Sequence, residues 1–490
     1  MYIFTVMDEG KAAGNGNNSL KYAAWLSPVL LCILLVGAVV FCRERMLFID
    51  APHILFRIIN GGNFWIEQHR YGSFISQVLP LAGAKMHLPL QWLMVLYSAG
   101  FYLFYLAVCM LLVRLQQYGL AILMGLYFTV MVSATYYWPN NEVHQGIAWL
   151  LLAFGLHACL VKGVRNSYLR TLLFTALFFL AIWTHPLVIP AALYLWMFFL
   201  VGNWQTQEDK RTVLIFSGIL VLICAVKVYA GMHDWYDSSK IDLVTHVDPN
   251  KIKGLLHAPQ LHYFLRNCLH HYWLFTLFTI AGLLALLFQR RYVLFIATIA
   301  AICGYVALVC VTFWEEGPRW YMESEYMPLV LIGCAPFAYY LLPKMKPSYG
   351  LALLVMVYMM RLVCIFNAGW PFSNRLSIME RMSYRMKEKH LSKVIITEPS
   401  TIDSALVMNW GAPVESLYMS ALNGENPQHT FIFMKPEEIK VADTTAKNIL
   451  LGCFERRTAA QLNARYFEID TTTTYKVMRY GELFKSKTIE

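Results

Sequence analysis

One carboxylate, Asp50, follows the first long hydrophobic segment and opens a polar stretch that extends to about His87. A carboxylate in a partly desolvated cleft takes a proton from a hydroxyl when it lies within hydrogen-bond reach, so Asp50 is a candidate general base. The second interpretation is structural, because an aspartate shortly before a proline, here Pro52, is a common start of a helix. The two roles are compatible, and the sequence leaves both open.

Other ionisable residues collect in segments between later hydrophobic stretches. His185 stands before a proline in an apolar region and either contacts a phosphate oxygen or is a structural histidine. Glu315 and Arg319 lie between two tryptophans, which indicates either a phosphate clamp or an aromatic belt with a surface ion pair. The complete set of candidate substrate-binding residues is Arg57, Glu67, Arg70, His144, His185, Glu315 and Arg319.

The sequence predicts neither a metal site nor a cofactor. His233, Asp234 and Asp237 are possible ligands, as are Glu142 and His144, but neither spacing defines a coordination site. A phosphate-cradling loop of the Gly-x-x-x-x-Gly-Lys type is absent from the sequence, which argues against ATP-driven pumping by this chain. Most of the eleven cysteines fall in apolar segments, where cysteine is a small hydrophobic residue.

The composition indicates the elements that must position these residues. Hydrophobic residues make up 58% of the chain and charged residues 14%, and the mean hydropathy is +0.48, as in a polytopic membrane protein. A helix needs about 20 apolar residues to cross the hydrocarbon. We therefore predict a mainly α fold with about eleven spans, centred near Leu31, Phe101, Leu126, Leu151, Leu177, Tyr194, Leu220, Leu277, Ile299, Leu331 and Val355. The alternative for residues 25–41, a cleaved signal sequence, fits less well because the apolar run is long.

Loop charge predicts the orientation, because short loops rich in Lys and Arg stay in the cytoplasm. Alternate loops are basic, which places the tail 1–21 inside and the loops 50–88, 232–270 and 314–326 outside. Arg43 and Arg45 count locally against this orientation. The same rule explains part of the net charge of +10, so nucleic acid is not an expected partner. The basic residues of the inner loops are Arg114, Lys162, Arg165, Arg170, Lys210, Arg211, Arg290, Arg291, Lys344 and Lys346.

The chain divides into a tail (1–21), a transmembrane bundle (22–366) and a C-terminal part (367–490). The C-terminal part has short apolar runs and predicts a small outward-facing α/β domain, with strands at 394–397, 430–434, 448–451 and 475–478 and its clearest helix at 459–464. Its first segment, 375–389, is basic and amphipathic, which fits a linker on the membrane surface or a solvated helix equally well.

This arrangement resembles the GT-C class of integral-membrane glycosyltransferases, which use sugars carried on polyprenyl phosphate or pyrophosphate. The matched features are a cytoplasmic N-terminus, an acidic residue soon after the first span (Asp50), a long outer loop with interfacial helices from Pro52 to His87, and a bundle followed by an outward α/β domain. Many members place two acidic residues together in that loop. This sequence has Ala51 beside Asp50, and Glu67 is the one later acidic residue of the loop.

The resemblance implies an inverting sugar transfer in which Asp50 is the base and an arginine (Arg57, Arg70 or Arg319) neutralises the lipid phosphate. The implied partners are a lipid-linked sugar donor, membrane lipids and a glycan, lipid or protein acceptor. The expected location is a bacterial inner membrane with the C-terminal domain in the periplasm, although an endoplasmic reticulum enzyme would have the same topology. A transporter or flippase of lipid-linked saccharides is the competing hypothesis, and a non-catalytic membrane subunit is a third.

Overall fold

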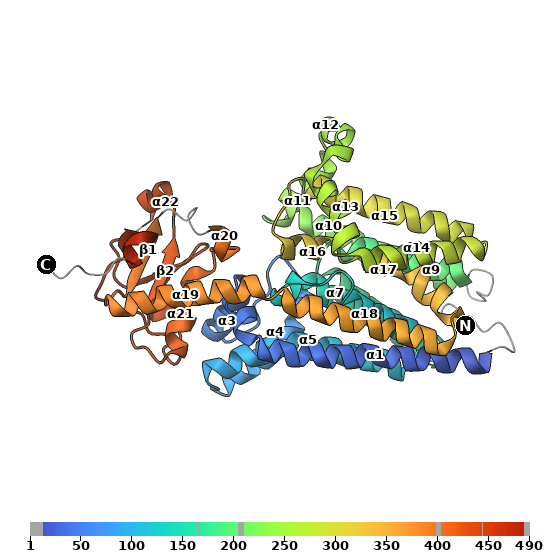
Figure 1. Cartoon of the computed structure of the whole chain (residues 1–490), viewed down its shortest axis with the longest axis horizontal. Coiled ribbons are helices and arrows are strands. Elements are labelled where there is room, and N and C mark those ends of the chain that lie inside the picture. The colour runs from blue at the N-terminus through green and yellow to red at the C-terminus, as the bar shows by residue number, and fades with distance from the viewer. Residues whose placement is uncertain (1–12, 164–166, 204–209, 398–402, 443, 485–490) are drawn as a thin grey trace.

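Long helices form a bundle, and a smaller α/β unit lies at one end of it (Figure 1). This computed structural model describes residues 13–163, 167–203, 210–397, 403–442 and 444–484. In the described residues, five helices are long and apolar enough to cross a membrane, and two bent helix pairs raise that number to seven if each pair is one span. The protein therefore has the character of a polytopic membrane protein.

The five candidate spans lie in α1 (Ala13–Val40), α5 (Leu90–Arg114), α10 (Lys210–Met232), α15 (Tyr292–Thr312) and the long helical segment Pro347–Glu388, which begins with α18 (Pro347–Asn367). The bent pairs are α13 (Pro259–His270) with α14 (Trp273–Phe288), at 85°, and α16 (Arg319–Tyr326) with the segment that begins at α17 (Leu329–Pro336), at 51°. The other bundle helices are α6 (Tyr118–Tyr127), α7 (Glu142–Gly163), α8 (Ser167–Ile182) and α9 (Val188–Asn203).

The predicted count of eleven spans is not confirmed. Each predicted centre lies in a helix, but several of these helices are short. The helix α6 has 10 residues, which extend for about 15 Å at 1.5 Å per residue, and residues 120–127 are all buried in the bundle. A hydropathy pattern alone does not separate such a core helix from a span, because both are continuously apolar.

An arginine inside the bundle secures the irregular segment that follows α6. Arg361 of α18 is buried, and its guanidinium donates to the carbonyls of Thr129 at 2.9 Å, Val132 at 2.7 Å and His271 at 3.0 Å. Carbonyls that have left a regular helix need such donors in an apolar environment. The chain at 128–133 is therefore free to turn toward the outer loops, where it presents Trp138.

Several short helices lie at the end of the bundle that faces the α/β unit, and others lie elsewhere in the bundle (Figure 1). The amphipathic helix α3 (Asp50–Gly61) lies between the two parts, and Gly62 ends it in the left-handed conformation at φ 64°. The other short elements are α2 (Cys42–Met46), η1 (Tyr71–Ser73), α4 (Phe74–Lys85), η2 (Ala134–Tyr137), α11 (Asp237–Thr245), α12 (Pro249–Lys253), η4 (Leu255–His257), η5 (Phe337–Leu341) and η6 (Leu342–Lys344).

The C-terminal unit contains a three-stranded parallel sheet in the order β2-β1-β5 and an antiparallel pair β3-β4. The central strand β1 (Lys393–Thr397) pairs with β2 (Thr430–Phe433) and β5 (Lys476–Arg479), with Ile395 opposite both Ile432 and Val477. The four predicted strands are confirmed, with β3 at Ile449–Leu451, and β4 (Arg456–Thr458) is an additional strand. The helix predicted at 459–464 is wrong, because only the 3-10 turn η8 (Ala459–Gln461) forms there.

The helices of this unit are α19 (Trp370–Glu388), α20 (Asp403–Leu406), α21 (Ala412–Leu422), α22 (Pro436–Val441) and α23 (Tyr480–Phe484). The segment predicted as a basic linker forms most of α19, which packs on α20, α21 and α23. Its inner face is buried and includes Arg375, Met379, Met382 and Met386, so α19 contributes to the core of the unit while its basic outer face remains exposed.

Hydrogen bonds join the α/β unit to the outer loop of the bundle. The backbone N–H of Asn463 donates to Asn60 Oδ1 at 2.6 Å, and the Asn463 side chain donates to the carbonyl of Ile59 at 3.1 Å. The Tyr466 hydroxyl donates to the carbonyl of Leu88 at 2.9 Å. These contacts hold both ends of the segment 50–88 against the C-terminal unit.

Candidate functional site

Asp50 is the first residue of α3, and its side chain faces the bundle. Its Oδ2 accepts a hydrogen bond from the indole Nε1 of Trp138 at 2.6 Å, and it makes no cap on α3. The capping role that the sequence suggested is therefore not the role in the structure. The carboxylate is half-buried, and the indole is its one hydrogen-bond partner in the described residues.

Trp138 is itself held by aromatic packing. Its ring meets the edge of Trp320 with 4.5 Å between ring centroids, and Trp320 in turn packs against Phe48 at 5.4 Å. Only 8% of Trp138 is exposed. Because the indole has little freedom to rotate, its N–H stays directed at Asp50.

A buried carboxylate of α16 orders the turn that carries Trp138. Glu323 accepts the backbone N–H groups of Ser133 and Thr135, each at 2.9 Å. Arg319 forms an ion pair with the same carboxylate, with its Nε 3.1 Å from Oε1. Arg319, which the sequence suggested as a phosphate ligand, is thus paired with a residue that positions the turn before Trp138.

The backbone just before Asp50 is strained and is held by the C-terminal unit. Ile49 has φ 42°, a conformation that costs a β-branched residue on the order of 1–3 kcal/mol. Its N–H donates to Glu415 Oε1 at 2.7 Å, and Arg375 donates to Glu415 Oε2 at 2.5 Å and to the carbonyl of Leu47 at 2.8 Å. Glu415 and Arg375 are buried, so they fix the direction in which α3 begins.

The surroundings of Asp50 favour its protonated form. Burial is the main cause that raises the pKa of Asp50; the nearby carboxylates of Glu142 and Glu67 also raise it, the Trp138 hydrogen bond and Arg70 lower it, and together these effects bring the pKa to about 7. A carboxyl group with a pKa near 7 exchanges its proton readily at neutral pH, which is the property a general base or acid needs.

A polar pocket, with about 280 Å³ of empty space that is partly open to solvent, lies near Asp50, although Asp50 itself does not line it. Ile54, one turn along α3, lines it, as do the two carboxylates that act on Asp50. Asn140 and Gln145 are at least nine-tenths buried, and their amide oxygens have no hydrogen-bond partner among the described residues. Such acceptors suit a ligand that brings hydroxyl or amine donors. The other lining residues are Trp65, Glu67, Ser73, Ser76, Gln77, Tyr97 and Glu142.

Four charged groups lie at and behind this pocket and balance one another; Arg70, Lys227 and Asp237 are buried, and Glu142, which lines the pocket, is half-buried. Arg70 is 3.0 Å from Glu142 and 3.3 Å from Asp237, and Lys227 is 3.6 Å from Asp237. Lys227 also donates to the carbonyl of Gln68 at 3.3 Å. The cluster ties the first outer loop to α7, α10 and α11, and it leaves Arg70 without excess positive charge.

No protein family model, curated protein or solved structure matches this chain.

His185 lies near the same four charges. Burial lowers its pKa, and the positive charges of Arg70 and Lys227 lower it further, so the imidazole is neutral at pH 7. Its Nδ1 accepts the backbone N–H of Leu187 at 3.2 Å, which leaves the proton on Nε2. A neutral imidazole donates one hydrogen bond and brings no charge to an anion.

The other predicted residues lie elsewhere. His144 is buried between the rings of Tyr127 and Phe128 and bonds the Tyr127 hydroxyl at 3.1 Å. Glu315 is exposed. Arg57 forms an ion pair with Glu455 of the C-terminal unit at 2.8 Å. Asp50, Glu67 and Arg70 are therefore the predicted residues that the structure brings together, with His185 at the edge of the group.

The partners of Asp50 were not identified from the sequence. Trp138, Asn140 and Gln145 fall in one short region before and after the start of α7, and the polar run 140–144 was the available signal. No group of three His, Cys, Asp or Glu side chains within the described residues could hold a metal ion. The chemistry that the site offers is proton transfer by Asp50 beside a pocket rich in hydrogen-bond acceptors.

Proposed function

We propose that this protein is a membrane glycosyltransferase that moves a sugar from a polyprenyl-phosphate carrier to an acceptor hydroxyl at the outer face, with Asp50 as the base. The observation that carries the proposal is the half-buried Asp50 carboxyl, whose pKa is raised to about 7 and which lies near a pocket lined by hydrogen-bond acceptors. Sugar transfer requires a group that takes a proton at neutral pH, close to a site whose side chains accept hydrogen bonds from hydroxyl groups.

The proposed step is a direct displacement. Asp50 takes the proton of the acceptor hydroxyl as that oxygen bonds to the anomeric carbon. The bond from the anomeric carbon to the phosphate oxygen breaks, and the polyprenyl phosphate leaves with the electron pair. The configuration at the anomeric carbon inverts, and no cofactor takes part.

The polar pocket supports a sugar as the group that is transferred. The unpaired amide oxygens of Asn140 and Gln145 and the carboxylates of Glu67 and Glu142 are hydrogen-bond acceptors, which match the hydroxyl groups of a sugar. Because carboxylates repel anions, the same pocket disfavours the phosphate group itself. The phosphate would lie outside this pocket, toward the membrane.

The proposal also requires a cation for the departing phosphate. Arg57 and Arg319 each have a carboxylate partner, and Arg70 has two. Of these three arginines, Arg70 is the one whose charge lowers the pKa of Asp50. Arg70 is therefore our candidate, and the phosphate would take the place of Asp237, which does not line the polar pocket, as its partner.

The proposed setting follows the orientation deduced from the loop charges. The donor tail would enter between helices from the lipid, and the acceptor would be a glycan, lipid or protein on the side of the C-terminal unit. We place the protein in a bacterial inner membrane with that unit in the periplasm.

A flippase for lipid-linked saccharides is the second candidate. The observation in its favour is Lys227, which is 1% exposed in the candidate span α10 and pairs with Asp237. Ionisable residues in such positions often mark transport pathways.

One experiment separates the two functions. The purified protein in lipid nanodiscs is given a panel of radiolabelled polyprenyl-phosphate sugars with extracts of possible acceptors, and the same lipids are tested for movement across liposomes. We expect transfer of label to an acceptor. Movement of the lipid without transfer would replace the proposal with the flippase.

A further inference from the structure

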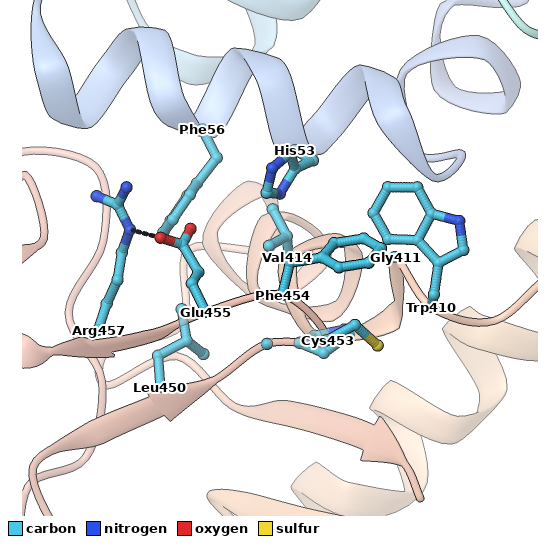
Figure 2. A pocket seen from close by; sticks show the side chains of 12 residues that line it. His53, Phe56, Trp410, Gly411, Val414, Leu450, Cys453, Phe454, Glu455 and Arg457 are labelled. Atoms are coloured by element: carbon cyan, nitrogen blue, oxygen red, sulfur yellow. Dashed lines mark ion pairs between the residues drawn. The ribbon is translucent and has the colours of Figure 1, made fainter. Parts of the chain in front are cut away.

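A second pocket lies between α3 and the C-terminal unit (Figure 2). Its empty space is about 380 Å³, part of which is open to solvent, so a ligand here would be only partly enclosed. His53 and Phe56 reach it from α3, and Trp410, Phe454 and Arg457 reach it from the C-terminal unit. The other lining residues are Gly411, Pro413, Val414, Leu450, Gly452, Cys453 and Glu455. The proposed transfer step uses none of them.

Three rings form one wall of this pocket. The centroids of Trp410 and Phe454 are 5.0 Å apart, and His53 is 6.0 Å from the first and 6.4 Å from the second, all in edge-to-face arrangements. Phe454 is 67% exposed although it stands in the connection between β3 and β4. A large exposed aromatic ring beside a pocket is typical of a binding surface.

The polar groups of the pocket carry both signs of charge. Arg57 and Arg457 both approach Oε2 of Glu455, at 2.8 Å and 3.0 Å, so the other carboxylate oxygen is free of arginine. Burial, together with the charge of Arg57, lowers the pKa of His53 to about 4, so the imidazole is neutral at pH 7. Glu455 would repel an anion, and the two arginines would repel a cation. The pocket therefore favours a neutral ligand with several hydrogen-bonding groups.

We propose that this pocket binds one sugar unit of a neutral saccharide. A sugar ring has an apolar C–H face, which packs on Phe454 or Trp410, and hydroxyl edges, which donate to Glu455 and accept from Arg457 and His53. A purely apolar ligand would leave these polar groups without partners.

The place of the pocket on α3 suggests what the saccharide is. His53 follows Asp50 by three residues, a spacing that brings two helical side chains within roughly 5–6 Å at their Cβ atoms. A saccharide held at His53 would thus extend toward the Asp50 carboxylate. Its assignment as the acceptor rests on the proposed glycosyl transfer, whereas its binding does not.

The test measures binding without catalysis. The full-length protein in nanodiscs is titrated with neutral oligosaccharides of two to four hexose or N-acetylhexosamine units, and binding is followed by saturation-transfer NMR. We expect at least one member to bind, and Phe454→Ala to weaken it about tenfold through loss of the stacking surface. Because Phe454 is mostly exposed, this variant should keep its fold.

Glu455→Gln is the second variant, and it should weaken the same saccharide by removing the charged acceptor. Trp370→Ala is the matched control, because Trp370 is 72% exposed on α19 and does not line the pocket. No binding by any member at millimolar concentration, or equal binding by wild type and Phe454→Ala, would overturn the proposal. Asp50→Asn should bind the saccharide as wild type does, so a failure of transfer and a failure of this site give different results.

Discussion

At the scale of single residues, the environment of Asp50 combines burial with one strong donor. Burial and two neighbouring carboxylates favour the neutral acid, and the Trp138 indole favours the anion, so the pKa of Asp50 rises to about 7. A surface aspartate would titrate near 4 and would be a poor base at neutral pH. The indole therefore keeps the basic form of Asp50 accessible.

Replacement of Trp138 by phenylalanine isolates this donor. Trp138→Phe keeps an aromatic ring against Trp320 and removes the N–H that donates to Asp50 at 2.6 Å. Since the hydrogen bond favours the anion, its loss should raise the pKa of Asp50. For wild type, kcat/KM should rise with pH through about 7, as Asp50 loses its proton. In Trp138→Phe the same rise should occur at higher pH.

Trp196→Phe is the matched control, since the indole of Trp196 donates to Ser217 at 2.9 Å in a distant part of the bundle. Its pH profile should coincide with that of wild type. If kcat/KM of Trp138→Phe rises over the same pH range as that of wild type, the group whose titration causes the rise is not Asp50.

At the scale of elements, the position of α3 depends on a buried ion pair in another part of the chain. Glu415 of α21 holds the strained Ile49, and Arg375 of α19 holds Glu415. The C-terminal unit therefore shapes the backbone that carries Asp50, although it contributes no group to the polar pocket.

Glu415→Gln should reveal this coupling. The amide loses the charge that balances the buried guanidinium of Arg375, and breaking a buried pair costs on the order of 3 kcal/mol. We expect the free energy of unfolding, measured with denaturant, to fall by that amount. The folded fraction of the variant should also transfer sugar more slowly. Glu380→Gln removes an exposed partner of Arg43 and should cost less than about 1 kcal/mol. Equal stability of the two variants would contradict the role of the pair.

The strands of the C-terminal unit were predictable because each is a short apolar run between turn residues. The helix α21 was not, because Glu415, Ser416 and Ser420 interrupt its apolar pattern. These three residues are fully buried and receive partners from other elements. These polar residues can lie in a buried helix because residues distant in sequence hydrogen-bond to them. The hydrophobic pattern of the segment itself does not reveal those partners.

The candidate site shows the same limit. Asp50, Glu67 and Arg70 could be found because the polar loop after a first span is a distinct feature of the sequence. Trp138 could not, because its approach to Asp50 depends on the turn that Glu323 holds, 190 residues from Ser133 in sequence.

At the scale of the whole molecule, a buried arginine changes how the loop charges are counted. Arg45 seemed to oppose the predicted orientation, but it is buried, donates to Ser98 at 2.9 Å and lies over the ring of Tyr136. Arg43 pairs with Glu380 of α19. Arg45 is therefore not an exposed loop charge, whereas Arg43 is exposed and still counts locally against an outer C-terminal unit.

Labelling of Cys453 tests this orientation. Cys453 is exposed as a residue, but neighbouring groups at the pocket it lines desolvate its thiol and raise its pKa to about 11, so labelling requires alkaline buffer and a long reaction time. We expect a membrane-impermeant maleimide to label intact bacterial spheroplasts that express wild type, and Cys453→Ser to lose that label. Labelling only after the membrane is permeabilised would place the unit in the cytoplasm.

The most direct test of the account is sugar transfer by Asp50→Asn beside wild type, with the same polyprenyl-phosphate donor and at pH values on both sides of 7. Asparagine still accepts the Trp138 hydrogen bond but cannot take a proton. We predict a fall in kcat of at least about 100-fold with donor binding and thermal stability retained, and loss of the rise near pH 7. Transfer within about tenfold of wild type, with the rise unchanged, would contradict the assignment of Asp50 as the base.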